Sequence, residues 1–192
     1  MTGIGGCRSI WLWMRGRDAD TEPGATVFRS TNGTLALPIA FGVATLVEVV
    51  ALHFLIPWQW LRIALAAVSM WSLVAALGYL AKHRVHPHYL TASSLVLRQS
   101  GEVVATIPRS DIASVVPVRR FAETSARIAG STLHLPNLDG TNIDARLTQT
   151  VAARIPTVFG RAADPASIDR ICLYVDDPGA MERELKTRPL RL

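Results

Sequence analysis

Two long apolar runs, residues 35–57 and 61–81, are the clearest feature of the hydrophobic pattern. As α-helices they would each be roughly 28–34 Å long, which matches a bilayer hydrocarbon core of about 30 Å. Only the segment PWQWLR, residues 57–62, joins them. Because so short a link forces the helices to run antiparallel, the pattern predicts a transmembrane helical hairpin.

The charges that flank the two runs predict how this hairpin is oriented. The turn carries only Arg62, whereas the outer ends are flanked by Arg15, Arg17, Arg29, Lys82, Arg84 and Arg98. By the positive-inside rule, the turn lies outside and both termini lie in the cytoplasm. Trp58 and Trp60 suit the aromatic belt at the outer interface. We therefore expect a multi-pass protein of the plasma (inner) membrane.

Two ionisable residues, Glu48 and His53, interrupt the first apolar run. On a helical period Glu48 shares one face with the small residues Ala40, Ala44 and Ala51. Small residues mark close helix contacts in membranes, so we expect this face to meet the second helix, where Ser69 lies at the depth of Glu48. His53 is expected near the outer interface. Packing or partner contact is the favoured role of Glu48, and a proton or ion relay through Glu48 and His53 is the alternative.

From residue 89 onward the apolar period changes to two, which is typical of half-buried strands. The expected inward positions are Leu95, Leu97, Val103, Ala105, Ile107, Ile112, Ser114, Val116, Val118, Ile143, Ala145, Leu147, Ile171, Leu173 and Val175. Asp139-Gly140 predicts a hairpin between residues 133–135 and the strand that follows. Asp177 and Pro178 predict the N-cap and first residue of a helix that ends near residue 188 and packs Met181 and Leu185 inward.

These elements predict an α+β membrane protein with three segments. Residues 1–34 form a largely flexible cytoplasmic segment, residues 35–81 the hairpin, and residues 82–192 a cytoplasmic domain. Many short strands closed by one amphipathic helix favour a small antiparallel β-barrel, or an orthogonal sandwich, capped by the C-terminal helix. Two interpretations of residues 1–13 stay open: residues 11–14 contact the bilayer interface, or translation begins at Met14.

The stretch YLTASSLVLRQSGEVVATIPRSDIASV, residues 89–115, resembles the bacterial pleckstrin-homology-like (PH-like) domains that follow a pair of membrane helices. The elements that carry the resemblance are Tyr89, Leu90-Thr91, residues 95–98, Gly101, Ile107-Pro108, Asp111-Ile112 and Ser114-Val115. The resemblance implies a seven-stranded barrel, a C-terminal capping helix and a binding function. The first hairpin turn, residues 99–102, lacks the basic cluster with which eukaryotic members hold phosphoinositides, so we do not expect that ligand.

Charge and cysteine content indicate which classes of partner and ligand the sequence favours. The net charge is +5 and the pI about 9.9, but the basic residues are scattered, which favours an anionic membrane surface over nucleic acid. Cys7 and Cys172 cannot build a disulfide framework or a zinc site. Arg119 and Arg120 are candidates for contact with lipid phosphate or an acidic partner. His83, His86 and His88 are a weak metal candidate, because no Cys, Asp or Glu lies near them to complete the ligand set.

No nucleophile elbow, phosphate loop or HExxH motif is present in the sequence, so we expect neither an enzyme nor a cofactor. The favoured function is a membrane-anchored scaffold or binding module that contacts a membrane protein partner or a second copy of itself. One alternative is a small transport or proton-handling component that uses Glu48. A further alternative is a lipid-acting metalloenzyme that uses the three histidines.

Overall fold

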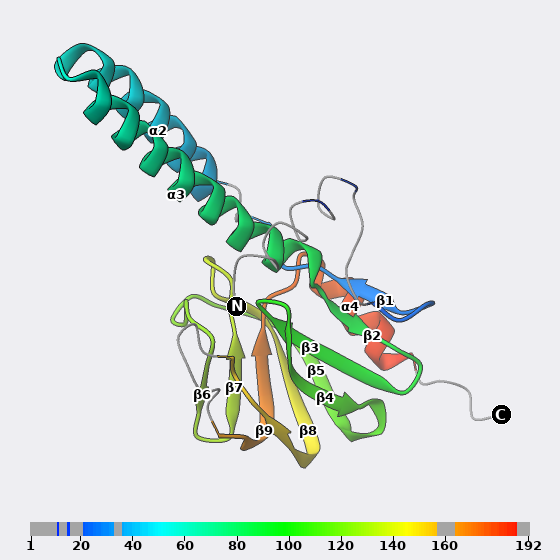
Figure 1. Ribbon diagram of the computed structural model, residues 1–192. Coiled ribbons are helices and arrows are strands. Elements are labelled where there is room, and N and C mark those ends of the chain that lie inside the picture. The colour runs from blue at the N-terminus through cyan, green and yellow to red at the C-terminus, as the bar shows by residue number, and fades with distance from the viewer. Residues whose placement is uncertain (1–10, 12–14, 16–20, 33–35, 157–163, 188–192) are drawn as a thin grey trace.

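The computed structural model describes residues 11, 15, 21–32, 36–156 and 164–187, with the backbone alone at 36–38, 79–80 and 82–84. Within these residues the protein is α+β, with three helices and two sheets. Helices α2 (Ala36–Leu55) and α3 (Gln59–Val85) lie side by side and project away from the sheets (Figure 1). Helix α4 (Pro178–Lys186) lies against the β-rich part.

The two long helices correspond to the two predicted apolar runs, but they differ in length and apolarity. In α3 the stretch Gln59–Gly78 is long and apolar enough to cross a membrane, whereas the apolar stretch of α2, Ile39–Leu55, is shorter. Among the described residues, therefore, only α3 meets the requirement for a span. The helices contact each other along a stripe of half-buried residues at helical spacing, Gly42, Thr45, Val49 and Leu52 of α2 and Leu65, Ser69 and Leu73 of α3.

The strands form two separate sheets, so the predicted closed barrel is wrong. The four-stranded sheet has the order β1-β2-β3-β4, and the five-stranded sheet has the order β5-β8-β9-β7-β6. Their bounds are β1 Thr26–Phe28, β2 His88–Leu90, β3 Ser94–Gln99, β4 Glu102–Pro108, β5 Ile112–Arg120, β6 Arg127–Ala129, β7 Thr132–Leu135, β8 Thr141–Ala153 and β9 Ala166–Leu173. The 3₁₀ turn η1 (Arg109–Asp111) leads from the first sheet to the second.

Strand β1 corrects the expectation for residues 1–34. Rather than belonging to a largely flexible segment, residues 26–28 pair antiparallel with β2, and Phe28 is buried in the core. The β-rich part is thus completed by residues that precede the helical pair in the sequence. Because β1 and β2 flank α2 and α3 in the chain, both ends of the helical pair are fixed to the same sheet edge.

The hairpin predicted at Asp139-Gly140 is also corrected. These residues do connect β7 to β8, but β9 lies between the two strands and pairs parallel with β7. The local turn is closed only by an isolated bridge between Asn137 and Gly140. Asp139-Gly140 therefore correctly predicts where the chain reverses, but it does not predict which strands pair in the sheet.

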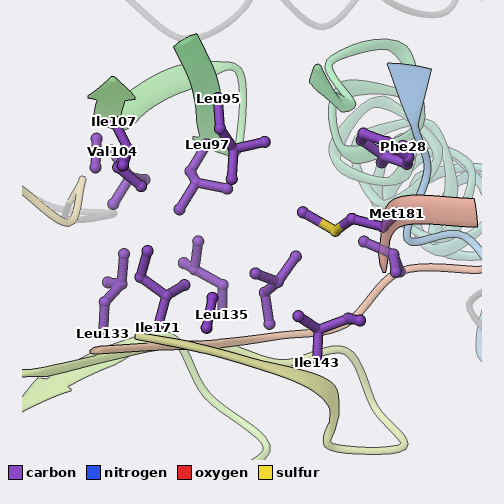
Figure 2. Packing of buried hydrophobic residues seen from close by; sticks show 14 of the residues in the cluster. Phe28, Leu95, Leu97, Val104, Ile107, Leu133, Leu135, Ile143, Ile171 and Met181 are labelled. Atoms are coloured by element: carbon purple, nitrogen blue, oxygen red, sulfur yellow. The ribbon is translucent and has the colours of Figure 1, made fainter. Parts of the chain in front are cut away.

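The core lies between the two sheets. Leu95, Leu97 and Ile107 of the first sheet face Leu133, Ile143 and Ile171 of the second (Figure 2). Val104 is buried while Val103 is half exposed, which reverses the expectation for Val103, because a β-bulge between β3 and β4 shifts the register. The inward positions predicted for β8 and β9 are confirmed. In β5 the prediction is wrong for Ser114 and Val116, which are exposed while Val115 is buried, because the register shifts between Ile112 and Ser114.

Helix α4 is confirmed with its cap. Asp177 Oδ1 accepts a hydrogen bond from Ala180 N at 2.8 Å, and Pro178 is the first helical residue. Met181 is fully buried and reaches between the sheets (Figure 2), with Leu185 packed against the same core. The helix ends at Lys186 and closes one open end of the sandwich.

Candidate functional site

The helical pair presents apolar side chains that nothing in the described part of the chain covers. The most exposed among them are Phe54, Leu55, Trp60 and Trp71, at 80%, 76%, 70% and 77%. Exposed apolar surface of this extent marks a membrane or partner contact in a stable protein. The exposed apolar residues are spread over both helices, from Ile39 to Leu55 and from Trp58 to Val74. Helix α3 continues from there to the sheets (Figure 1).

Glu48 lies on this exposed surface, not in the contact between α2 and α3. The predicted face of Ala40, Ala44, Glu48 and Ala51 is exposed throughout, whereas Ser69 is half-buried in the stripe that faces α2. The structure therefore does not bring Glu48 and Ser69 together, because the helices pack through the face centred on Thr45 and Val49. Glu48 makes no hydrogen bond or ion pair with another described residue.

His53 lies at the far end of the pair, close to Arg62. Arg62 Nη1 donates to the carbonyl oxygen of His53 at 3.4 Å, a long and weak hydrogen bond. The His53 ring contacts Phe54 edge-on, with the ring centroids 5.6 Å apart. A pocket opens between the helices at this end, lined by Val49, Leu52, His53, Arg62, Ile63 and Ala66.

The junction between the helical pair and the sheets is held at two points. At the first, the carboxylate of Asp176 accepts from Thr31 N and Asn32 N, each at 2.9 Å, and from Thr31 Oγ1 at 2.9 Å. The backbone N–H of Asp176 donates in turn to Arg29 O at 2.7 Å. At the second, α3 continues into the domain, where Ala81 and Val85 are buried at 0% and 2% exposure. The start and end of the pair are thus both fixed to the β-rich part.

Of the three histidines, the structure describes the side chains of His86 and His88, and neither belongs to a group of metal ligands. His88 Nδ1 accepts a hydrogen bond from Arg98 N at 3.0 Å, so this nitrogen is already occupied. Burial lowers the pKa of His88 to about 4, which keeps the ring neutral. His86 is half-buried beside Gly101, and the side chain of His83 lies outside the described residues. No group of three His, Cys, Asp or Glu side chains in the described part of the chain could hold a metal ion.

Arg120 belongs to a polar cluster on the outer face of the five-stranded sheet. Its Nη2 donates to Asp144 Oδ2 at 2.6 Å, and Arg170 donates to both oxygens of the same carboxylate, with Nε–Oδ1 2.9 Å and Nη2–Oδ2 2.5 Å. The hydrogen bond from Arg170 is the first reason that the pKa of Asp144 falls to about 2. Asp144 is therefore fully ionised at neutral pH.

Cys172 lies beside this cluster and does not have the properties of a nucleophile. Its sulfur is 3.2 Å from Arg120 Nη1, yet burial raises the pKa of the thiol. A neutral, buried thiol reacts slowly. His134 pairs with Cys172 in the sheet register, and desolvation lowers its pKa despite the nearby Glu123. We therefore interpret this polar cluster as a set of contacts that join neighbouring strands rather than as a catalytic site. Its members are Arg120, Asp144, Arg170 and Cys172.

Arg119 and Phe121 form the accessible part of the predicted arginine pair. The Arg119 guanidinium lies over the Phe121 ring, 4.9 Å from the ring centroid, and Phe121 is 66% exposed. Of the two arginines proposed as contacts, Arg119 is therefore available to a partner, while Arg120 is committed to Asp144. Phe121 was missed in the sequence because a single aromatic residue after a strand gives no periodic signal.

No local pattern in the sequence identifies Asp144, Arg170 and Asp176 as organising residues. A polar residue within a period-two strand, such as Asp144, normally faces solvent, and Asp176 simply precedes the helix cap Asp177, so neither position signals such a role. The strand register places Asp144 beside Cys172 and Arg146 beside Arg170, and that register is not visible in the local sequence. No protein-family model, curated protein or solved structure matches this chain.

Proposed function

We propose that the protein is a membrane-anchored binding module, with the helical pair α2/α3 in the plasma membrane and the β-rich part on the cytoplasmic side. The observation that carries the proposal is the course of α3. This helix exposes apolar side chains over Gln59–Gly78 and then buries Ala81 and Val85 in the domain. One end of this helix exposes apolar side chains that water does not favour, and the other end is part of a folded core. This combination supports a membrane anchor that is joined directly to a binding domain.

Both ends of the pair lie at the domain, so α2 would cross the bilayer with α3 as a hairpin. Apolar residues of α2 are exposed as fully as those of α3, including Leu46, Val47 and Phe54. Positive residues are concentrated where the pair meets the domain, and Arg62 alone lies at the tip. That distribution supports cytoplasmic termini by the positive-inside rule.

The fold of the β-rich part is compatible with the resemblance to bacterial PH-like domains. Of the features that the resemblance implies, the C-terminal capping helix is present, whereas two facing sheets stand in place of the closed barrel. Membership of that family is part of this proposal. The described polar residues give a structural cluster rather than a reaction centre, which supports a binding role over catalysis.

Two surfaces would recognise the partner. On the cytoplasmic side, Arg119 and Phe121 combine a cation with an exposed ring, the residue types that dominate protein interfaces. In the bilayer, the face of Glu48 would meet polar groups of another chain, since an unpaired carboxyl facing lipid is unfavourable. The partner would be a membrane protein or a second copy of this chain.

The test combines membrane extraction with purification. Alkaline carbonate should leave the full chain in the membrane pellet, and a C-terminal tag should bring down a stoichiometric partner in mild detergent, identified by mass spectrometry. The variant Arg119→Ala/Phe121→Ala should lose that partner while staying in the pellet. Arg183→Ala, an exposed position on α4, is the matched control and should retain it. Release of the wild-type chain by carbonate would refute the anchor.

A further inference from the structure

We infer that the tip of the helical pair is a binding site for an anionic phospholipid, with Arg62 and His53 contacting the headgroup phosphate. The inference rests on the proposed function, because it requires this end of α2 and α3 to lie in a bilayer interface. It adds a ligand class and a site to the anchor. Four observations lead to it.

The first observation is the pocket itself. It has a volume of about 210 Å³ and lies between the end of α2 and the start of α3. Four of its lining residues are apolar, Val49, Leu52, Ile63 and Ala66, and the two polar ones are His53 and Arg62. Ligand sites have this composition, a mainly apolar wall with a few polar groups. The volume is below the roughly 300 Å³ of a drug-sized site, but it accommodates a headgroup phosphate and the adjoining carbons.

The second observation is that the donors at this pocket are largely unused. Arg62 makes one side-chain hydrogen bond to a described residue, the 3.4 Å contact with His53 O. A guanidinium carries five N–H donors in a planar fork that matches phosphate oxygens, so most of its capacity remains available. An imidazole adds at least one further donor in either tautomer.

The third observation concerns charge. After Glu48 the next acidic residue in the sequence is Glu102, so neither the turn nor α3 carries a carboxylate. A zwitterionic headgroup would bring an ammonium next to Arg62 and His53 with no acid to receive it. An anionic headgroup brings no such cation. Charge complementarity therefore selects anionic phospholipids over zwitterionic ones.

The fourth observation is the setting of the pocket. Trp58 and Trp60 flank it at 62% and 70% exposure, and tryptophan concentrates at the headgroup level of membranes. Exposed apolar side chains continue from the pocket along both helices, where an acyl chain would lie. The phosphate contact thus lies at the interface and the acyl contact lies deeper in the bilayer, as in a membrane lipid.

The probe is native mass spectrometry of the full-length protein released from nanodiscs of equal phosphatidylglycerol and phosphatidylcholine. We expect wild type to retain phosphatidylglycerol preferentially, and Arg62→Gln to lower that preference about fivefold, the typical effect of one basic residue at an anionic surface. His53→Gln should lower it by less. Arg183→Gln is the matched control, since it removes one exposed arginine from the domain at a position with no proposed contact and should leave the preference unchanged.

Each other outcome overturns the inference. Equal retention of both lipids by wild type excludes a specific site, and loss of preference in Arg183→Gln but not in Arg62→Gln moves lipid binding to the domain. Displacement by soluble glycerol phosphate would show that free phosphate, not a lipid, is the ligand. If the lipid preference is absent while carbonate leaves the protein in the membrane, the inference fails and the anchor stands. If carbonate extracts the protein, both fail.

Discussion

Arg170 and Asp144 lie on neighbouring strands and share two hydrogen bonds, from Nε to Oδ1 at 2.9 Å and from Nη2 to Oδ2 at 2.5 Å. Arg120, on the strand at the other side of Asp144, donates to the same carboxylate. One carboxylate therefore joins three strands of the five-stranded sheet across its outer face. Bidentate arginine pairs of this kind combine strength with a fixed geometry.

Replacing Asp144 with Asn should destabilise the domain by about 2 kcal/mol at pH 7. The folded-state pKa of about 2 lies below the ordinary 3.8, so the carboxylate stabilises the fold above pH 4. That contribution should be lost as the pH falls from about 4 toward 2. The free energies of unfolding of wild type and Asp144→Asn, measured in detergent by near-ultraviolet circular dichroism, should become equal over that range. Asp169→Asn, an exposed position on the neighbouring strand β9, is the control and should behave as wild type.

His88 should give a separate acid-dependent step. Its folded-state pKa of about 4 lies below 6.5, so protonation favours the unfolded chain, and stability should fall by roughly 3 kcal/mol between pH 6.5 and pH 4. In His88→Asn the amide oxygen can still accept from Arg98 N, but the residue no longer titrates. The variant should therefore lose the slope between pH 6.5 and 4, whatever its absolute stability. A slope equal to that of wild type would assign the step to another group.

Asp176→Ala should loosen the start of the helical pair without unfolding the sheets. The carboxylate accepts three hydrogen bonds from Thr31 and Asn32, so its removal leaves these donors to water. We expect hydrogen exchange at the amides of residues 31 and 32 to accelerate at least tenfold, which corresponds to about 1.4 kcal/mol of lost local stability. Exchange in β8 should be unchanged. Asp139→Ala, an exposed carboxylate, serves as the control.

Gly140→Ala should cost about 3 kcal/mol of folding stability. Gly140 has φ +89°, and a Cβ there would lie 2.0 Å from the carbonyl oxygen of Arg120, so the main chain must move. Gly130→Ala is a matched control, because Gly130 also has positive φ, +59°, but no atom lies within 4 Å of its Cβ position. It should lower the folding stability by only about 1 kcal/mol, the cost of placing a residue with a Cβ in the left-handed backbone region. Equal losses in the two variants would contradict the close approach at Arg120.

Glu48 provides a prediction for the surface that we propose lies in the membrane. Glu48→Gln keeps a hydrogen-bonding side chain of the same size, so it should retain the co-purifying partner, whereas Glu48→Leu should lose it. The reason is that a polar side chain facing lipid gains by pairing with a polar group of another chain. Quantitative mass spectrometry of the tagged variants measures the partner yield. Retention in both variants would place the contact elsewhere.

Local patterns in the sequence predicted the local elements well. The apolar runs gave both long helices, and Asp177-Pro178 gave the start of α4 with its capping contact, because such signals act within a few residues. The inward positions of β8 and β9 followed from their period of two. These features depend on side chains that are neighbours in the chain, so a single sequence contains them.

What the sequence could not predict depends on contacts between distant residues. The parallel pairing of β7 with β9 is one example, since the Asp139-Gly140 turn suggested a hairpin with β8 instead. The direction of Glu48 is another example. The small residues that share its face predicted that this face would contact α3, but Thr45 and Val49, on a different face of α2, make that contact. Asp144, Arg170 and Asp176 became recognisable only once the register had placed their partners beside them.

The double attachment of the helical pair has a consequence for how the module would meet a partner. A domain on a flexible tether samples many orientations, and each binding event must restrict them at an entropic cost. Here α3 enters the core directly, and Asp176 fixes the residues that lead to α2. The membrane would therefore set the height and the direction in which Arg119 and Phe121 face. A partner diffusing in the same plane would encounter that surface already aligned, and the search would take place in two dimensions.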